Sequence, residues 1–366
     1  MVPYLLQALQ QPSIRPQNIS GTIISLLRHH PNLHMALEAC KTGAIEDKTN
    51  QLAGRLASIP LLLQLMELCP IPDTEIERLL RLIRQATLRQ LTDETIEPAN
   101  LPFYVALALH CFSNEYVFLE SSEETSGIEQ LENKISILLA NNKPVPSLWV
   151  ALLASYRPLH IFSWSDQLSQ SNSTNSIQKI LTQQIDEVRE EQRLRSKIKA
   201  LSTINNDISQ AVREQYEENP YPRWVNPDLS PKPKTIGTIL QELKIDFNLT
   251  GQQFPSHPEI LIAGCGTGQH SLGTASRFSN SSVLAVDLSL SSLSYAIRKT
   301  QELGISNIDY MHADILELHK LDRQFDLIES AGVLHHMAES LVGWKVLVAL
   351  LRPRGLMQIG LYSEIA

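Results

Sequence analysis

The chain has 366 residues, of which 43% are hydrophobic, enough for two packed domains. Its net charge of −8 argues against a general nucleic-acid-binding surface, although it leaves room for a local basic pocket. No apolar run approaches the roughly eighteen residues that a membrane span needs. The four cysteines, Cys40, Cys69, Cys111 and Cys265, form no C-x-x-C pair. We therefore expect a cytoplasmic protein with no membrane segment, zinc site or disulfide framework.

Residues 1–215 predict an all-helical N-terminal domain, because apolar residues recur there at helical spacing. Asp73 is expected to cap a helix whose apolar face includes Ile76 and Ile83. Other strongly apolar segments predict helices at Ser58–Leu68, Val105–Phe112, Leu131–Leu139 and Leu148–Tyr156. No repeat of about 34 residues is evident. A protein partner for this domain stays an open alternative.

Two segments lead out of the helical part. The run Asp186–Lys199 interleaves charges of both signs, which is typical of an exposed helix. The stretch Gln215–Trp224 then combines two prolines with three aromatic residues. Proline removes a backbone donor and restricts the residue before it, so we expect a rigid, extended connector here.

A glycine-rich loop is the most informative stretch of the chain. The short apolar run Ile260–Ala263 suits a buried parallel strand. It leads into Gly264-Cys265-Gly266-Thr267-Gly268, with glycine at alternate positions. Residues without a Cβ allow a sharp turn and the close approach of a ligand. The free N–H groups of the following helix favour polar or anionic groups, so we expect a ligand that carries a nucleoside.

The glycine spacing bears on which nucleoside binds. The dinucleotide fingerprint is G-x-G-x-x-G, but the sixth position counted from Gly264 is Gln269, and counted from Gly266 it is Ser271. A NAD(P)-dependent oxidoreductase is therefore disfavoured and kept as the weaker alternative. The next apolar run, Ser282–Asp287, ends in a carboxylate that is well placed to accept hydrogen bonds from both ribose hydroxyls.

Three further strands are expected downstream. They are Ile308–Asp314, Phe325–Ser330 and Leu356–Leu361, the last after a turn at Leu350–Gly355. Five strands that alternate with helices predict an α/β, Rossmann-like parallel sheet of order 3-2-1-4-5, counted along the chain. A ligand should then lie across the carboxyl ends of strands one and four.

These motifs resemble the class I methyltransferases that depend on S-adenosylmethionine (SAM). The segment Tyr216–Trp224 ahead of the loop Ile262–Gln269 is similar to a bacterial group in which tetratricopeptide repeats precede the methyltransferase domain, although the repeats are not seen here. The resemblance covers roughly residues 55–366. It implies a SAM-binding domain at 216–366, in which 216–257 form a connector and leading helices.

The resemblance also implies a set of cofactor-binding residues. They are Gly264, Cys265, Gly266, Thr267, Gly268, Gln269, Asp287, Leu288, Asp314, Ile315 and Ser330. In the family the carboxylate after strand three receives the adenine amino group, and Asp314 can also cap the turn that follows it. We expect Cys265 to contribute its backbone and small size and no nucleophile.

Candidate substrate contacts and a lid come from the same resemblance. His335 and His336 follow strand four, where the family's substrate pocket opens, and are either a base or polar residues at a helix start. Tyr216, Tyr221 and Arg223 either cover the cofactor or pack at the domain junction.

The expected activity is methyl transfer to an unidentified acceptor. Such transfer needs donor and acceptor held in line, and a base only if the acceptor arrives protonated. The sequence identifies no catalytic residue. Since His29, His30 and His34 lack cysteine or acidic partners at ligand spacing, we expect no metal. The family fold closes with two further strands after strand five, so we expect a chain truncated there. A non-catalytic SAM-fold interaction protein is the main alternative.

Overall fold

The chain forms two compact units in the computed structural model, which describes residues 1–91, 98–170, 176–202, 217, 222–243 and 253–362. One unit contains residues 1–189 and 224–226, and the other contains residues 190–223 and 227–366. The first boundary falls inside helix α12 (Glu187–Arg195), earlier than the division after residue 215 that the sequence suggests. Each unit is described separately below.

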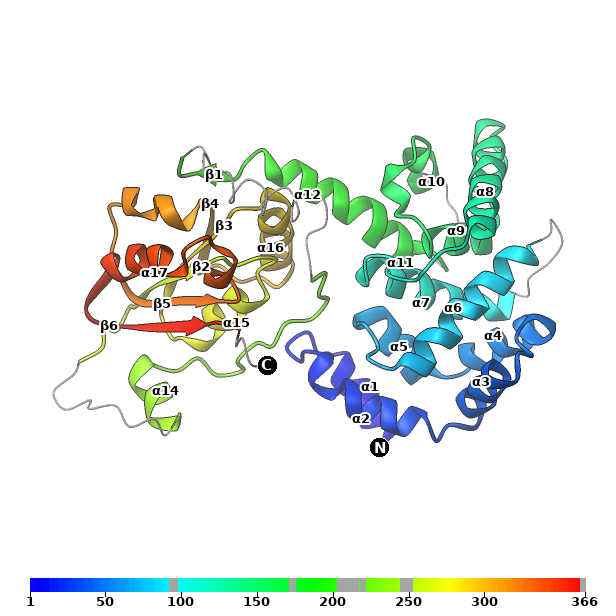
Figure 1. The fold of residues 1–366 in the computed structure, drawn as a ribbon, viewed down its shortest axis with the longest axis horizontal. Coiled ribbons are helices and arrows are strands. Elements are labelled where there is room, and N and C mark those ends of the chain that lie inside the picture. The colour runs from blue at the N-terminus through cyan, green and yellow to red at the C-terminus, as the bar shows by residue number, and fades with distance from the viewer. Residues whose placement is uncertain (92–97, 171–175, 203–216, 218–221, 244–252, 363–366) are drawn as a thin grey trace. The chain divides into compact units, whose positions relative to one another are not determined.

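The first unit is built from helices (Figure 1). Its α-helices are α1 (Val2–Leu9), α2 (Gln17–Leu27), α3 (Pro31–Thr42), α4 (Thr49–Ala57), α5 (Pro60–Leu68), α6 (Thr74–Arg89), α7 (Leu101–Ser113), α8 (Ser122–Ala140), α9 (Ser147–Ala154), α10 (Ser165–Gln170) and α11 (Gln178–Leu181). Short helical turns, η1 (Glu46–Lys48), η2 (Pro98–Asn100), η3 (Leu159–Ile161) and η4 (Thr182–Asp186), connect or extend them. Across the described residues, no helix is both long and apolar enough to cross a membrane.

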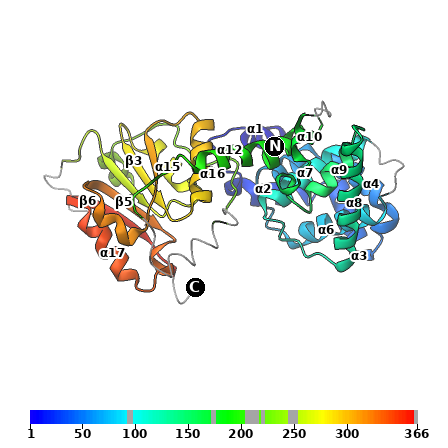
Figure 2. The ribbon, with the colours of Figure 1, turned by 90° about the horizontal axis from the view of Figure 1, so that it is seen from above.

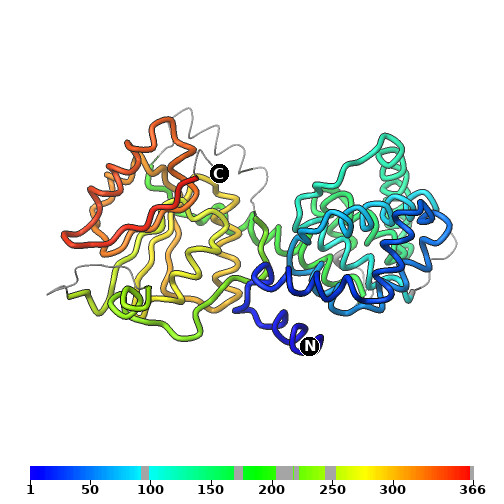
Figure 3. The backbone as a smooth tube through the Cα atoms, turned by 60° about the horizontal axis from the view of Figure 1, so that its bottom comes forward, coloured from blue at the N-terminus to red at the C-terminus, as the bar shows by residue number. Residues whose placement is uncertain are grey.

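Local sequence explains how these helices begin and pack. The expected cap at Asp73 is confirmed, because its Oδ1 accepts hydrogen bonds from the amides of Glu75 and Ile76, each at 3.1 Å. Helix α7 is buried from Phe103 to Ser113, as its apolar composition on all sides requires. Figure 3 traces this unit from blue α1 to the green segment near α12.

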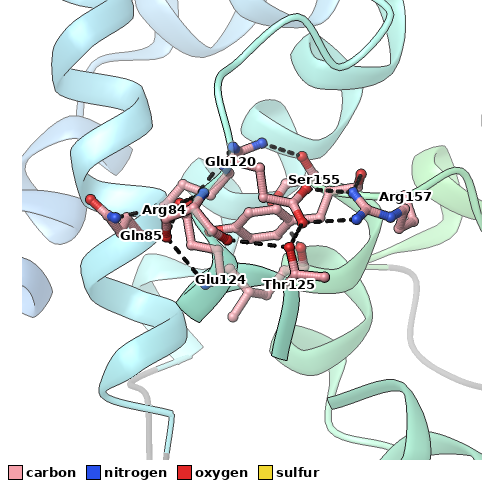
Figure 4. A network of polar contacts seen from close by, with 10 residues as sticks. Arg84, Gln85, Glu120, Glu124, Thr125, Ser155 and Arg157 are labelled. Carbon is pink, nitrogen blue, oxygen red and sulfur yellow. Dashed lines mark hydrogen bonds and ion pairs between the residues drawn. The ribbon is translucent and has the colours of Figure 1, made fainter. Parts of the chain in front are cut away.

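A buried polar network links α6, α8 and the end of α9 (Figure 4). Arg84 is 1% exposed, and its Nη1 donates to the carbonyl of Ser155 at 2.9 Å. Its guanidinium stacks over the ring of Tyr156 at 3.9 Å and lies 4.0 Å from the carboxylate of Glu124. The hydroxyl of Tyr156 donates to that same carboxylate at 2.9 Å. Since a buried charge is costly without partners, these residues must fold together.

The second unit contains a six-stranded sheet in which every recorded pairing is parallel. Its strands are β1 (Lys199–Ala200), β2 (Glu259–Ala263), β3 (Ser282–Asp287), β4 (Ile308–His312), β5 (Phe325–Ala331) and β6 (Leu351–Gly360), in the order β1-β4-β3-β2-β5-β6. The last five of these correspond to the expected order 3-2-1-4-5. Figure 1 shows them following one another from β4 to β6.

Two details of the sheet differ from expectation. The five-strand order is wrong in leaving out β1, which pairs with β4 beside Met311 and His312. The expected charged helix Asp186–Lys199 therefore does not continue to Lys199, because Lys199 belongs to β1. There it pairs with the edge of β4, whose backbone groups would otherwise be unpaired. The expected turn at Leu350–Gly355 lies largely within β6. The register is irregular there, because an advance of two residues along β5 corresponds to an advance of five along β6, and Arg354 takes a positive φ of 64°.

Helices cover both faces of this sheet. On one face α14 (Ile236–Glu242), α15 (Gln269–Arg277) and α16 (Leu290–Glu302) pack against residues such as Ile260 and Ile262. On the other, η5 (Ile315–Lys320), η6 (Leu334–His336) and α17 (Ser340–Ala349) pack against Leu261 and Ile328. Figure 2 shows α17 beside β5 and β6 at one end of the unit. With both faces covered, the carboxyl ends of the strands are where a ligand can enter.

Candidate functional site

The glycine-rich loop forms the turn between β2 and α15. Gly264 has a φ of +80°, and a Cβ there would lie 2.3 Å from a methyl of Val333. Gly268 has a φ of +86°, and a Cβ there would lie 2.6 Å from Ala296. These two positions need glycine for packing within the protein. At Gly266, by contrast, a Cβ would meet nothing within 4 Å, so this part of the loop faces open space.

Asp287 is tied to the glycine-rich loop from the end of β3. Its Oδ2 accepts from the amide of Gly266 at 2.7 Å, and its Oδ1 accepts from the amide of Ser289 at 3.0 Å. Burial raises the pKa of Asp287, although these backbone hydrogen bonds oppose the shift. A carboxylate offers about four acceptor positions, so the amides do not fill all of them and Asp287 can still accept from a ligand.

Asp314 follows β4 and begins the η5 helix. Its Oδ1 accepts from the amide of Leu316 at 2.9 Å, which confirms the capping role. The residue is 3% exposed and lies beside Ile315 at the same end of the sheet.

A cavity of about 900 Å³ opens at this end of the strands. Of the residues expected to bind a cofactor or substrate, ten line it: Gly264, Cys265, Gly266, Thr267, Gln269, Asp287, Leu288, Asp314, Ile315 and His336. The Nε2 of Gln269 is buried and has no hydrogen-bond partner among the described residues. Burial raises the pKa of Cys265 well above that of an ordinary thiol, and the charge of Asp287 adds to the shift, so this cysteine stays protonated.

Other expected site residues lie outside the cavity wall. Gly268 precedes α15 and packs on α16, and the hydroxyl of Ser330 donates to the carbonyl of Ala263 at 2.9 Å. The ring centroids of His335 and His336 lie 4.2 Å apart with the rings tilted by 48°, and burial lowers the pKa of His335. Arg223 lies 3.8 Å from Glu191.

The segment Tyr216–Trp224 is described only in part. Tyr216 and Tyr221 lie outside the described residues, so their expected lid role stays a prediction. Pro222 lines the cavity, and its carbonyl accepts from the hydroxyl of Thr267 at 2.9 Å. Trp224 is 1% exposed and belongs to the first unit. This segment therefore reaches the cavity wall through Pro222.

Sequence reasoning missed a histidine–carboxylate pair at the cavity. His270, in the first turn of α15, lines the cavity, and its Nε2 lies 2.9 Å from Oε2 of Glu329 in β5. Glu329 is 1% exposed and also accepts from the hydroxyl of Thr274 at 2.5 Å. A charged residue inside the apolar run Phe325–Ser330 was the available signal, because a buried carboxylate requires a partner.

Polar and apolar residues outside the expected set complete the wall. They are Pro222, His270, Arg277, Ser289, Ser292, Ala313, Leu316, Ala331, Gly332, Val333, Met337, Ala338, Glu339, Val342, Gln358 and Tyr362. Across the described ranges no cluster of His, Cys, Asp and Glu could hold a metal ion.

Residues 260–355 match the family model of a methyltransferase domain. The match spans β2 to β6 and so contains the glycine-rich loop, Asp287 and Asp314. It supports a class I methyltransferase domain in the second unit and indicates S-adenosylmethionine as the cofactor.

Individual proteins are similar to this chain over part of its length. An uncharacterised protein of Synechococcus sp. is 28% identical over 47% of this chain and 41% of its own length. A probable (S)-tetrahydroprotoberberine N-methyltransferase of Papaver bracteatum is 31% identical over 21% of this chain and 22% of its own. This chain thus spans less than half the length of these curated relatives. Among solved structures, PKMT2 of Rickettsia typhi with AdoHcy is 28% identical, covering 28% of this chain and 20% of that one, at a TM-score of 0.26.

Proposed function

We propose that the second unit binds SAM at this cavity and transfers its methyl group to an acceptor that is still to be identified. The observation that carries the proposal is the match of residues 260–355 to a methyltransferase domain, over the segment that forms the cavity. The glycine spacing, which departs from the dinucleotide fingerprint, supports SAM over NAD.

The residues at the cavity suit such a cofactor. The open side of Gly266 lets a ligand approach the loop, and the buried, unpartnered Nε2 of Gln269 offers a donor to it. Asp287 keeps acceptor positions for ribose hydroxyls while its other positions hold the amides of Gly266 and Ser289. Asp314 would serve the adenine amino group while it caps η5.

When bound, SAM supplies an electrophilic methyl group on a sulfonium. The chain's own part is to orient donor and acceptor and to limit water around them, which is the main requirement of a displacement reaction. Pro222 and the residues after β5, such as Met337 and Val342, provide apolar wall for that purpose.

Calorimetry with S-adenosylhomocysteine (SAH) and with NAD tests the proposal. We expect SAH to bind and NAD to give no measurable heat. Tight NAD binding without a response to SAH would overturn the assignment. A mass-shift screen of candidate acceptors with SAM then separates an active enzyme from a protein that binds SAM without catalysis.

A further inference from the structure

His270 lines the cavity and is paired with the buried carboxylate of Glu329 behind it. Glu329 lies in the fifth position of β5, where its neighbours in sequence, Ile328 and Ser330, are both buried. Burying a carboxylate is costly unless it is paired and hydrogen-bonded. Both partners come from α15, where His270 and Thr274 are four residues apart and so share one face.

The hydrogen bond to Glu329 determines which ring nitrogen of His270 carries the proton. Burial alone would raise the pKa of Glu329, but the hydrogen bond and charge of His270 and the hydroxyl of Thr274 outweigh it, and the pKa is lowered. Glu329 is therefore a carboxylate near neutral pH and can only accept, so Nε2 of His270 is the donor. In the neutral ring, Nδ1 is then an acceptor with an unshared electron pair. The side chain is 33% exposed and lines the cavity, and no hydrogen bond of Nδ1 to a described residue is recorded.

The order of the strands places this pair on the side opposite the nucleoside. Asp287 and Asp314 follow β3 and β4, on one side of β2, whereas Glu329 lies in β5 on the other side. Gln358, the register partner of Glu329 in β6, lines the cavity too. The cavity thus extends along the sheet from β4 to β6, about 19 Å at the usual strand spacing. If the nucleoside occupies the β3–β4 side, the β5–β6 side is left for the methyl acceptor.

We propose that His270, oriented by Glu329, is the residue that takes the proton from the methyl acceptor. This inference rests on the proposed function. The acceptor is of the class that arrives protonated, with a hydroxyl or amine nucleophile. Its O–H or N–H bond breaks, the electron pair stays on the nucleophile, and the proton goes to Nδ1. The resulting imidazolium keeps its Nε2–H bond to Glu329, whose charge stabilises it, and later loses the proton to solvent. Thr274 is a positioning residue that holds Glu329.

The chemistry of Nδ1 can be tested without knowing the acceptor. Diethylpyrocarbonate acylates an unprotonated, accessible imidazole nitrogen, and peptide mass mapping reports the rate at each histidine. We expect His270 to be modified in the folded protein at neutral pH. In Glu329→Gln its rate should fall about fivefold when both proteins are measured at alkaline pH, where the ring is unprotonated in each, since a charge-assisted hydrogen bond to Nε2 is replaced by a neutral one. His336, which also lines the cavity but is not paired with Glu329, is the internal control and should react at an unchanged rate.

Nitrogen-15 spectra of histidine-labelled protein report the tautomer of His270 directly. Neutral His270 should carry its proton on Nε2, and Glu329→Gln should mix the two tautomers. If Glu329→Gln fails to fold, Thr274→Val, which removes one of the two hydrogen bonds to Glu329, should give a smaller fall in rate. Inert His270 beside reactive His336, or a proton on Nδ1, would overturn the proton-acceptor role.

SAH calorimetry on the same samples distinguishes a failure of the proposed function from a failure of the role of His270. Binding of SAH with an inert His270 overturns only the role of His270. Absence of SAH binding overturns the proposed function, and with it the role of His270 in methyl transfer even where the ring reacts.

Discussion

Replacement of Asp287 by alanine tests the cofactor site most directly. Each hydroxyl that loses a charged acceptor weakens binding, and we expect a total loss of about 1–3 kcal/mol, or roughly 5- to 150-fold in the Kd for SAH. The magnitude depends on the acceptor capacity that remains after Asp287 has bound backbone amides such as those of Gly266 and Ser289. Isothermal calorimetry measures it, with Asp309→Ala, an exposed acidic residue outside the cavity wall, as the matched control.

The same variant also releases the glycine-rich loop, so weaker binding alone is ambiguous. A double cycle removes the ambiguity: adenosine and 2′,3′-dideoxyadenosine are titrated against the wild type and Asp287→Ala. Loss of the two hydroxyls should weaken binding to the wild type and leave binding to the variant nearly unchanged. If the hydroxyls matter equally in both proteins, Asp287 is not their acceptor.

Stability should respond differently from affinity at this position. Because burial raises the pKa of Asp287, its ionised form is less favourable in the folded protein than in the unfolded chain. Above the folded-state pKa, ionisation of Asp287 therefore works against folding. Asp287→Ala should leave the melting temperature of the ligand-free protein nearly unchanged or slightly higher, as differential scanning fluorimetry can show.

Three further predictions concern the helical unit. Glu124→Leu should lower the unfolding free energy by about 3–5 kcal/mol, because it strands the buried charge of Arg84, and the double variant with Arg84→Met should recover much of the loss in urea titrations. Burial lowers the pKa of His110 to about 4, so the unfolded chain binds a proton that the folded one does not; stability should fall by up to about 3 kcal/mol between pH 6.5 and 4, and His110→Gln should remove that slope. Burial raises the pKa of Cys69 to about 12 and of Cys111 to about 11, so iodoacetamide should label both only after unfolding.

Local features of the chain explain what the sequence could predict. The cap at Asp73 depends on its own side chain and the two amides that follow it. The strand at Ile260–Ala263 is set by apolar residues between a proline and a glycine. Gly264 and Gly268 mark a turn because no other residue tolerates their backbone and neighbours. Each of these signals lies within a few residues of the feature it specifies.

The remaining features depend on residues that are far apart in the sequence. His270 and Glu329 are separated by fifty-nine positions and meet only because β5 lies beside β2 and α15 crosses above it. Gln358 joins the cavity through its register with Glu329. Strand β1 is only two residues long, too short for alternation to reveal, and it exists because the edge of β4 offers unpaired backbone groups.

Asp287, which lines the cavity, and Glu329, which is paired with the cavity residue His270, differ in how their acceptor positions are used, and this difference supports separate roles. Asp287 is held by backbone amides, which do not ionise near neutral pH and leave it ready for neutral donors such as hydroxyls. Glu329 is held by an imidazole and a hydroxyl, and its pKa is lowered where that of Asp287 is raised. The ionised form of a carboxylate with a raised pKa is stabilised by ligand donors, because their hydrogen bonds replace the hydration that burial removed. A carboxylate paired with histidine instead stabilises a positive charge on its partner, which is what a proton-accepting ring requires.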